Sequence, residues 1–178
     1  MDDEMIVLAN GEGKPIGIAP KLVSHNKNTP LHLAFSCYIF NHKGQFLLTQ
    51  RAFEKKVFPG VWTNSCCGHP APDEKIEDAI KRRVKDELGL TIEELEVALS
   101  DFRYTAEMNE VVENEICPVF VAKTSQQPQL NPQEVANYKW LNWKAFVSEA
   151  EKNPGDYSPW TVRQTTELQQ LPLLKKYI

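Results

Sequence analysis

The densest group of reactive side chains in the chain lies in residues 63–90. Two thiols, a turn glycine and an imidazole occupy the run Cys66-Cys67-Gly68-His69. A helical pattern follows and carries Arg83 and Glu87, which are four residues apart. Residues at that spacing lie on one face of a helix. The stretch therefore predicts a site to which a thiol, an imidazole and two opposite helix charges all contribute.

A pair of acids lies in a later apolar run, where Glu113 and Glu115 are separated by one residue. In a strand, two residues at this spacing project to the same face. Carboxylates placed so closely repel each other unless a cation or a proton lies between them. A solvated face of an edge strand would also explain the pair, so this run by itself leaves both interpretations open.

Three histidines could complete a metal site with this pair of acids, namely His25, His32 and His69. Three imidazoles and two carboxylates suit a five- or six-coordinate divalent metal such as Mn²⁺, Mg²⁺ or Zn²⁺. Any one of these histidines could equally be a surface or core residue. His42 falls in a predicted turn, and we assign it to the surface.

The central element that must position these groups is a helix over residues 74–88. Asp73 is its predicted N-cap, and Gly89 stands where a C-terminal glycine belongs. Its apolar residues recur at steps of three and four and form a stripe that faces the core. Strands are expected at 95–104 and 111–124, joined near residues 107–110.

Turn residues predict two hairpins ahead of this helix. Short strands at 6–8 and 15–18 flank a glycine-rich turn, and longer strands at 32–40 and 45–51 flank Asn41-His42-Lys43-Gly44. The alternation of strands and helices predicts an α/β or α+β fold, with a mixed β-sheet sandwiched between helices and an N-terminal hairpin. The remaining expected elements are a surface loop at 125–132, a strand at 136–141 and helices at 143–152 and 160–170.

Length and composition favour a single domain over residues 1–178, because 178 residues with 42% hydrophobic content can build one sizeable core. A formal net charge of −4 argues against a general nucleic-acid surface. The acidic start lacks the order of a signal peptide, and no apolar run approaches the roughly 20 residues of a membrane span. We expect a cytoplasmic monomer with no membrane or nucleic-acid partner.

The four cysteines do not suggest a disulfide scaffold. Cys66 and Cys67 are adjacent and would pair only with severe strain. Cys37 and Cys117 lie in apolar runs, where a buried thiol acts as a small hydrophobic group. We therefore expect reduced thiols.

The helical stretch resembles the Nudix box. Gly68, Glu74, Arg82 and the run 83–90 match its spacing of glycine, glutamate, arginine and the terminal acidic segment. Arg83 replaces a glutamate of the box, and Asp86 replaces the first of its paired glutamates. Those acids hold divalent metal in Nudix hydrolases, so the departures count against hydrolysis while the resemblance still implies a Nudix fold.

A narrower resemblance covers most of the chain, from Lys21 to Trp160. The runs 31–35, 58–70, 101–104, 113–119 and 158–160 look like those of the type I isopentenyl-diphosphate isomerases. That family implies reversible conversion of isopentenyl diphosphate to dimethylallyl diphosphate, by protonation and deprotonation through a carbocation. The implied substrate is a small diphosphate, and the implied role is the supply of isoprenoid precursors.

This second resemblance also implies a role for each candidate residue. Cys67 and Glu115 form the proton-handling pair, Tyr104 assists proton relay, and Trp160 places its ring near the cation, although core packing would also explain a tryptophan. A second metal, Mg²⁺, would join the diphosphate to Glu87 and to the backbone carbonyl of Cys67. One divalent metal (Mn²⁺, Mg²⁺ or Zn²⁺) would be held by His25, His32, His69, Glu113 and Glu115. The diphosphate would be bound by Lys21, Arg51, Lys55 and Arg83.

Two other classes of protein remain open at this stage. A Nudix pyrophosphohydrolase would account for the helix but would leave the histidines and paired glutamates without a role. A noncatalytic, metal-stabilised binding domain would account for the metal ligands but not for the basic positions. Only the isomerase accounts for both sets together.

Overall fold

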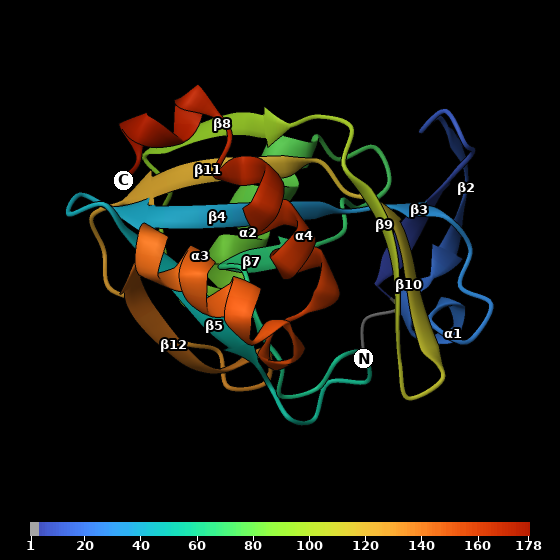
Figure 1. Cartoon of the computed structure of the whole chain (residues 1–178). Helices are drawn as coiled ribbons and strands as arrows, with labels where there is room; N and C mark the ends of the chain where they lie inside the picture. Colours follow the sequence, from blue (N-terminus) through green and yellow to red (C-terminus); the bar gives the residue numbers. More distant parts are fainter. Residues whose placement is uncertain (1–3) are drawn as a thin grey trace.

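The computed structural model describes residues 4–178, and within them the strands form two mixed sheets (Figure 1). The larger sheet follows the order β12-β5-β4-β11-β8, with β6 paired to β5 and β7 paired to β4. The smaller sheet follows the order β2-β1-β3-β10-β9. The strands of the larger sheet are β4 (Phe35–Asn41), β5 (Gln45–Arg51), β6 (Trp62–Thr63), β7 (Cys66–Gly68), β8 (Glu94–Leu99), β11 (Val119–Thr124) and β12 (Val135–Asn142). Those of the smaller sheet are β1 (Met5–Ala9), β2 (Pro15–Pro20), β3 (His32–Leu33), β9 (Arg103–Met108) and β10 (Val111–Ile116).

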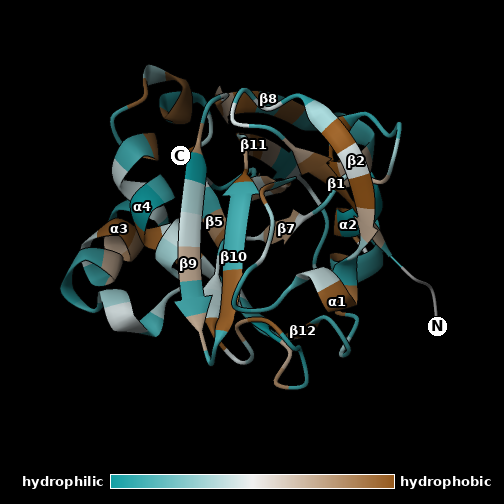
Figure 2. Cartoon of the chain, turned by 90° about the vertical axis from the view of Figure 1, so that its right-hand side faces the viewer, coloured by the Kyte–Doolittle hydropathy of each residue, from teal (hydrophilic) through white to brown (hydrophobic). Residues whose placement is uncertain are grey.

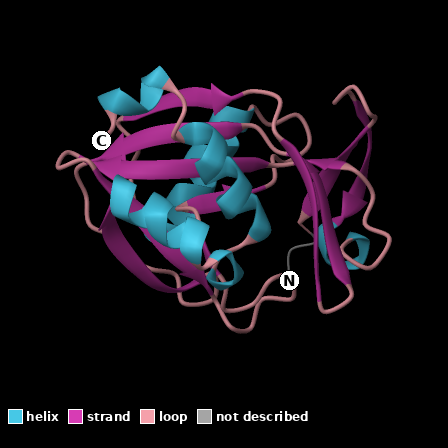
Figure 3. Cartoon of the chain, in the orientation of Figure 1, coloured by secondary structure: helices cyan, strands magenta, loops and turns pink. Residues whose placement is uncertain are grey.

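Helices cover both faces of the larger sheet (Figure 3). Helix α2 (Ile76–Leu88) lies against one face, and α3 (Trp143–Lys152) and α4 (Pro159–Leu168) lie against the other. Successive residues of β4 serve the two faces in turn, so that Cys37 packs in the core beneath α2 and Tyr38 in the core beneath α3 and α4. The expected mixed sheet between helices is confirmed. The shorter helices are α1 (Lys21–Ser24), η1 (Pro154–Asp156) and η2 (Pro172–Lys176).

Two chain segments pass directly from the smaller sheet into the larger one. One runs from β3 to β4 and the other from β10 to β11, and in each sheet the two segments are parallel neighbours. The sequence predicted uninterrupted strands here, but the strands break at Ala34 and at Cys117-Pro118. The chain changes sheet at both points, and at the second of them Pro118 has no backbone N–H to donate to a ladder. The predicted strand 95–104 divides in the same way, into β8 and β9.

Both predicted hairpins are confirmed. Strands β1 and β2 pair antiparallel, as do β4 and β5. Strand β2 lies at the edge of the smaller sheet, where Ile16 and Ile18 are exposed (Figure 2). The short helix α1, which follows β2 and leads to His25, was not foreseen. Among residues 4–178, no helix is both long and apolar enough to cross a membrane.

Helix α2 ends as predicted but begins later. Gly89 adopts a left-handed conformation with φ of 65° and closes the helix, which confirms the C-terminal prediction. The predicted N-cap is wrong, because Asp73 lies in a turn with φ of 62° and the N-cap is Lys75, which makes no side-chain capping bond. Glu74 stabilises this end in another way, since its carboxylate accepts from the Ala71 N–H at 2.8 Å and from Arg82 Nε at 2.8 Å.

Replacement of Glu74 by glutamine is expected to lower the free energy of unfolding by about 1 kcal/mol at pH 7. The hydrogen bonds from Arg82 hold the pKa of Glu74 below its usual value, so the folded state favours the ionised form. A carboxyl group with a lowered pKa stabilises the fold at pH values above its unfolded pKa of about 4.3. This stabilisation is lost as the pH falls from there through the folded-state pKa. Urea unfolding of both proteins should therefore show a difference at pH 7 that shrinks below pH 4, and a constant difference would contradict this.

Candidate functional site

Most predicted site residues line one cavity of about 370 Å³. Two of them do not lie on its wall. His32 is fully buried and contacts His69, and Glu87 is buried and accepts a hydrogen bond from Arg83. Those that line the cavity are Lys21, His25, Arg51, Lys55, Cys67, His69, Arg83, Tyr104, Glu113, Glu115 and Trp160.

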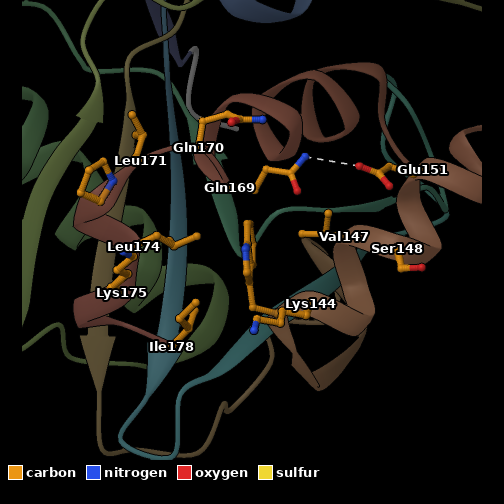
Figure 4. Close-up of a pocket in the computed structure, with 12 residues that line it drawn as sticks. Lys144, Val147, Ser148, Glu151, Gln169, Gln170, Leu171, Leu174, Lys175 and Ile178 are labelled. Atoms are coloured by element: carbon orange, nitrogen blue, oxygen red, sulfur yellow. Dashed lines mark hydrogen bonds between the residues drawn. The ribbon is translucent and has the colours of Figure 1, made fainter.

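A larger cavity of about 560 Å³ lies elsewhere, between α3, the end of α4 and η2 (Figure 4). Its wall includes Trp143, Val147, Leu171 and Leu174, and Gln169 donates to Glu151 across it at 3.3 Å. None of the predicted site residues lines it. Clustered acid–base and metal-binding groups are found in the smaller cavity, which is therefore the candidate site.

The three predicted histidines converge with the paired glutamates. Nε2 of His25 lies 3.2 Å from Glu113 Oε2, and Nε2 of His69 lies 3.1 Å from Glu115 Oε1. Nε2 of His32 is 3.5 Å from the same Glu115 oxygen. One potential ligand atom from each of His25, His32, His69 and Glu113 lies within 4.8 Å of all the others. The fold thus gathers a compact, buried set of nitrogen and oxygen donors.

Strand register explains this convergence. Strands β3 and β10 are parallel and place Glu115 opposite His32, while β9 places Tyr104 opposite Glu115 from the other side. Glu113 shares the face of Glu115 because it is two residues away on β10. Backbone carbonyls orient two of the rings, because Nδ1 of His25 donates to Lys21 at 2.7 Å and Nδ1 of His32 to Pro30 at 2.9 Å. These bonds leave Nε2 of both rings as the inward-facing acceptor.

The donor set fits a divalent metal. His25 Nε2 and Glu113 Oε2 lie 3.2 Å apart, but both are acceptors. Both atoms are buried and have no hydrogen-bond partner within residues 4–178. Nε2 of His32 and Nε2 of His69 lie only 3.1 Å apart, a contact that repels unless a proton or a cation lies between the two nitrogens. Imidazole and carboxylate donors together suit Mn²⁺, Mg²⁺ or Zn²⁺. The cluster is therefore a group that can bind a metal.

The pKa values of the two glutamates in the cluster are shifted in opposite directions. Burial and the charge of Glu115 raise the pKa of Glu113 above its usual value. Burial also acts to raise the pKa of Glu115, but the contacts of its carboxylate with His32 at 3.5 Å and with His69 at 3.1 Å outweigh burial and hold this pKa well below the usual value. Burial lowers the pKa of His69 to about 3. At neutral pH the Glu115 carboxylate is thus ionised beside a neutral imidazole.

Cys67 presents its thiol to the same cavity. Strand β7 pairs antiparallel with β4 and places Cys67 opposite Ser36. Its neighbour Cys66 faces the other way and packs in the core beneath α2. Burial raises the pKa of Cys67 to about 12, although the guanidinium of Arg51, with Nη1 3.9 Å from Sγ, opposes this shift. The thiol is therefore protonated at neutral pH, and all four cysteines of the chain are free.

Two aromatic residues form the apolar wall of the cavity. The rings of Tyr104 and Trp160 are 5.5 Å apart, and both side chains are almost fully buried. Nε1 of Trp160 donates to Asn64 Oδ1 at 3.1 Å, which orients the indole. Asn64 was not singled out from the sequence, because its role depends on contact with a helix nearly 100 residues later. Trp160 thus serves both the core and the cavity wall.

The four predicted basic residues all reach the cavity, but each already has a partner. Nζ of Lys21 lies 2.7 Å from Glu4 Oε2, and Lys55 pairs closely with Glu134. The remaining two contacts are between Arg51 Nη2 and the Val57 carbonyl, at 2.7 Å, and between Arg83 Nη2 and Glu87 Oε1, at 2.6 Å. Glu4 and Glu134 were not singled out from the sequence, since an acid in a charged terminal run or in a polar loop carries no distinctive signal.

Comparison with known proteins finds close relatives along nearly the whole chain. The NUDIX domain family model matches residues 30–161. A protein from Saccharopolyspora erythraea named isopentenyl-diphosphate Delta-isomerase is 54% identical over 94% of this chain and 87% of its own length. Proteins of the same name from Mycolicibacterium vanbaalenii and Salmonella paratyphi B are 49% and 45% identical, over 90% and 99% of this chain and 89% and 98% of their own lengths.

Solved structures show the same fold at much lower sequence identity. A crystal structure of a Deinococcus radiodurans protein aligns with a TM-score of 0.66 at 16% identity, over 98% of this chain and 99% of that one. The MutT protein from Methanosarcina mazei Go1 aligns with a TM-score of 0.63 at 19% identity, over 79% of this chain and 94% of that one. Together with the family match, these likenesses confirm the predicted Nudix fold.

Proposed function

The chain belongs to the isopentenyl-diphosphate Delta-isomerase family of Nudix-fold proteins, and we propose that Cys67 and Glu115 are the two residues that move protons in its reaction. The chain converts isopentenyl diphosphate to dimethylallyl diphosphate, the reversible reaction of that family. One observation carries the proposal about residues. Cys67 and Glu115 line a single cavity whose other residues include five basic side chains, among them the four proposed to bind the diphosphate.

The reaction needs one group that gives a proton and one that takes a proton. An unactivated alkene gains a proton at its terminal carbon, and the neighbouring carbon of the resulting carbocation then loses one. In the resting protein the Cys67 thiol holds a proton and the Glu115 carboxylate does not, which makes Cys67 the available donor and Glu115 the available acceptor. Arg51, close to Sγ, would stabilise the thiolate left behind. The roles exchange when the reaction runs in reverse.

The aromatic wall supports the cationic stage of this reaction. The side chains of Trp160 and Tyr104 line the cavity, and a cation over the face of such a ring is stabilised by about 2 kcal/mol when water is excluded. The hydroxyl of Tyr104 is a further candidate for proton relay, because strand register places this residue directly opposite Glu115. Burial, followed by the charge of Glu115, raises the pKa of Tyr104 well above its usual value, so the hydroxyl keeps its proton.

We infer that the chain holds two divalent metals. One would be bound by His25, His32, His69, Glu113 and Glu115, and a Mg²⁺ that accompanies the diphosphate would be bound by Glu87 and the backbone carbonyl of Cys67. When bound, these ions supply positive charge that favours the ionised carboxylates and offsets the charge of the diphosphate. The orphaned polar atoms of the histidine cluster support the first site. Glu87 is a buried carboxylate whose Oε1 lies 2.6 Å from Nη2 of the cavity-lining Arg83, and it would supply an oxygen donor to the second ion.

The basic residues would anchor the diphosphate and leave it intact. Lys21, Arg51, Lys55 and Arg83 approach the cavity from three separate parts of the chain. In a hydrolase an acid at the position of Arg83 would hold metal beside the phosphate under attack. An arginine there instead grips phosphate oxygens without promoting their loss.

One experiment tests the reaction and its main alternative together. The purified protein is incubated with isopentenyl diphosphate and a divalent metal, and the products are followed by proton NMR in D₂O and by a phosphate assay. We expect dimethylallyl diphosphate carrying deuterium, loss of turnover on chelation, and no phosphate. Release of phosphate without isomerisation would favour a pyrophosphohydrolase and would refute the proposed residue roles.

Replacement of Arg83 by glutamine is expected to raise KM by about 10- to 100-fold, because a charge-assisted hydrogen bond contributes about 1.5–3 kcal/mol. The kcat should change far less, since Arg83 does not contact the reacting carbons in this scheme. Steady-state kinetics measure both constants. Arg82, the preceding residue, pairs with Glu74 and does not line the cavity, so Arg82→Gln is the matched control. An unchanged KM in Arg83→Gln would remove this residue from the diphosphate site.

A further inference from the structure

Glu134 lies among the basic residues of the cavity and contacts two of them. Its Oε2 pairs closely with Lys55 Nζ, and its Oε1 lies 3.3 Å from Arg83 Nη2. The three side chains come from three separate segments, which are the loop before β12, the loop after β5, and α2. All three line the cavity. Glu134 is therefore a bridge between two proposed diphosphate-binding cations.

The backbone holds Glu134 in this position. The Ala52 N–H donates to the carbonyl of Glu134 at 3.0 Å, which ties it to the loop that carries Lys55. The Asn131 N–H donates to the carbonyl of Glu87 at 2.9 Å, which ties the same segment to the end of α2. Glu134 N–H in turn donates to Asn131 at 3.0 Å. The carboxylate is thus fixed relative to both of the elements that supply its partners.

A carboxylate beside a diphosphate needs an explanation, because like charges repel. Attraction of the substrate cannot be its role. Lys55, however, has a long flexible side chain, and Lys55 and Arg83 would repel each other if nothing lay between them. A fixed carboxylate between them removes this repulsion and restricts Lys55 before the substrate arrives. A side chain that is already restricted before the substrate binds lowers the entropic cost of binding.

We propose that Glu134 is a positioning residue that holds Lys55 and Arg83 in the arrangement that receives the diphosphate. The inference rests on the proposed function, since it takes these two cations as diphosphate ligands. Arg83 keeps donors for the substrate, because Nη1 makes no hydrogen bond within the described residues while Nε and Nη2 are held by Glu87 and Glu134. Glu134 acts through the cations and does not itself touch the reacting carbons.

The test is the Glu134→Gln variant, which removes the charge and keeps the size of the side chain. Loss of the charge removes repulsion of the diphosphate, which would lower KM, but it also releases Lys55 and Arg83, which would raise KM. The sign of the KM change therefore decides between the two roles. If Glu134 positions the cations, KM for isopentenyl diphosphate should rise by about tenfold, or about 1.4 kcal/mol, with kcat within about twofold of the wild type. If the carboxylate only repels the anion, KM should stay constant or fall, and that result would overturn the proposal. Calorimetric titration of magnesium pyrophosphate should show the same tenfold weakening, independent of turnover.

Two further variants sharpen the comparison. Glu54 lines the same cavity, is exposed and forms no ion pair within residues 4–178, so Glu54→Gln removes a nearby charge without a contact. Its KM should stay constant or fall slightly, and a tenfold rise would show that the effect does not depend on the contacts of Glu134 with Lys55 and Arg83. In a Lys55→Met background, Glu134→Gln should raise KM by less than it does in the wild type, because one of its partners is gone. Full additivity would contradict action through Lys55.

Failure of the inference can be separated from failure of the proposed function. If Arg83→Gln raises KM and Glu134→Gln does not, the cations bind diphosphate but Glu134 does not position them. If neither variant changes KM or pyrophosphate affinity, the diphosphate site itself has been placed wrongly. Circular dichroism and thermal denaturation of each variant exclude a loss of folding as the cause.

Discussion

Replacement of Cys67 by alanine is expected to lower kcat by at least about 1,000-fold, because the cavity then loses its proposed proton donor. The Cys67 thiol is half-buried, faces the cavity and holds its proton at neutral pH. No other cysteine lines the cavity among residues 4–178, so no neighbouring thiol can replace it. Turnover measured by NMR at saturating substrate tests this directly. More than about a tenth of wild-type turnover would contradict the role given to Cys67.

The adjacent cysteine provides a matched control. Cys66 lies on the same strand but belongs to the hydrophobic cluster that contains Ile80 and Val84 of α2, and it does not line the cavity. Cys66→Ala should therefore cost about 1 kcal/mol of stability through lost packing and leave kcat within a few-fold of the wild type. Cys67→Ala should show the opposite pattern, with near-normal thermal denaturation and no turnover. The pair of variants separates chemistry from folding.

Local patterns in the sequence predicted much of the fold. Turn glycines located the hairpins, and hydrophobic spacing together with Gly89 located α2 and its end. The errors occur where tertiary contacts override local preference. Asp73 is a good capping residue in principle, but a turn with positive φ leads the chain into the helix two residues later. The breaks at Ala34 and Cys117 arise because the strands change sheet, which local alternation does not reveal.

The site was predictable as a set of residue types but not as a geometry. Three histidines and two glutamates indicated a metal site, yet their convergence depends on the parallel pairing of β3 with β10, about 80 residues apart. The acidic partners of the basic residues could not be predicted from the sequence for the same reason. Glu134 follows an ordinary polar loop, and only the backbone bonds to Ala52 and Glu87 bring that loop to the cavity.

The second large effect is expected for Glu115→Gln, which should lower kcat by at least about 1,000-fold and reduce the metal content of the purified protein. The variant keeps the shape of the side chain but removes the carboxylate that we propose as the proton acceptor. Glutamine also has an NH₂ group in place of one carboxylate oxygen. This group cannot accept a hydrogen bond from His69 Nε2, which now lies 3.1 Å from Glu115 Oε1. Metal per chain is measured by inductively coupled plasma mass spectrometry, and turnover is measured on the same samples.

Glu113→Gln separates the two roles assigned to Glu115. Glu113 belongs to the same cluster, through its contact with His25, but has no proposed part in proton transfer. Both variants should bind metal at least about tenfold more weakly than the wild type. Added Mn²⁺ should restore turnover to Glu113→Gln as the site refills, whereas Glu115→Gln should stay inactive when fully loaded, because its proton acceptor is gone. If added metal alone restores turnover to Glu115→Gln, Glu115 acts only as a metal ligand. If untreated Glu115→Gln keeps its full metal content, Glu115 is not a ligand.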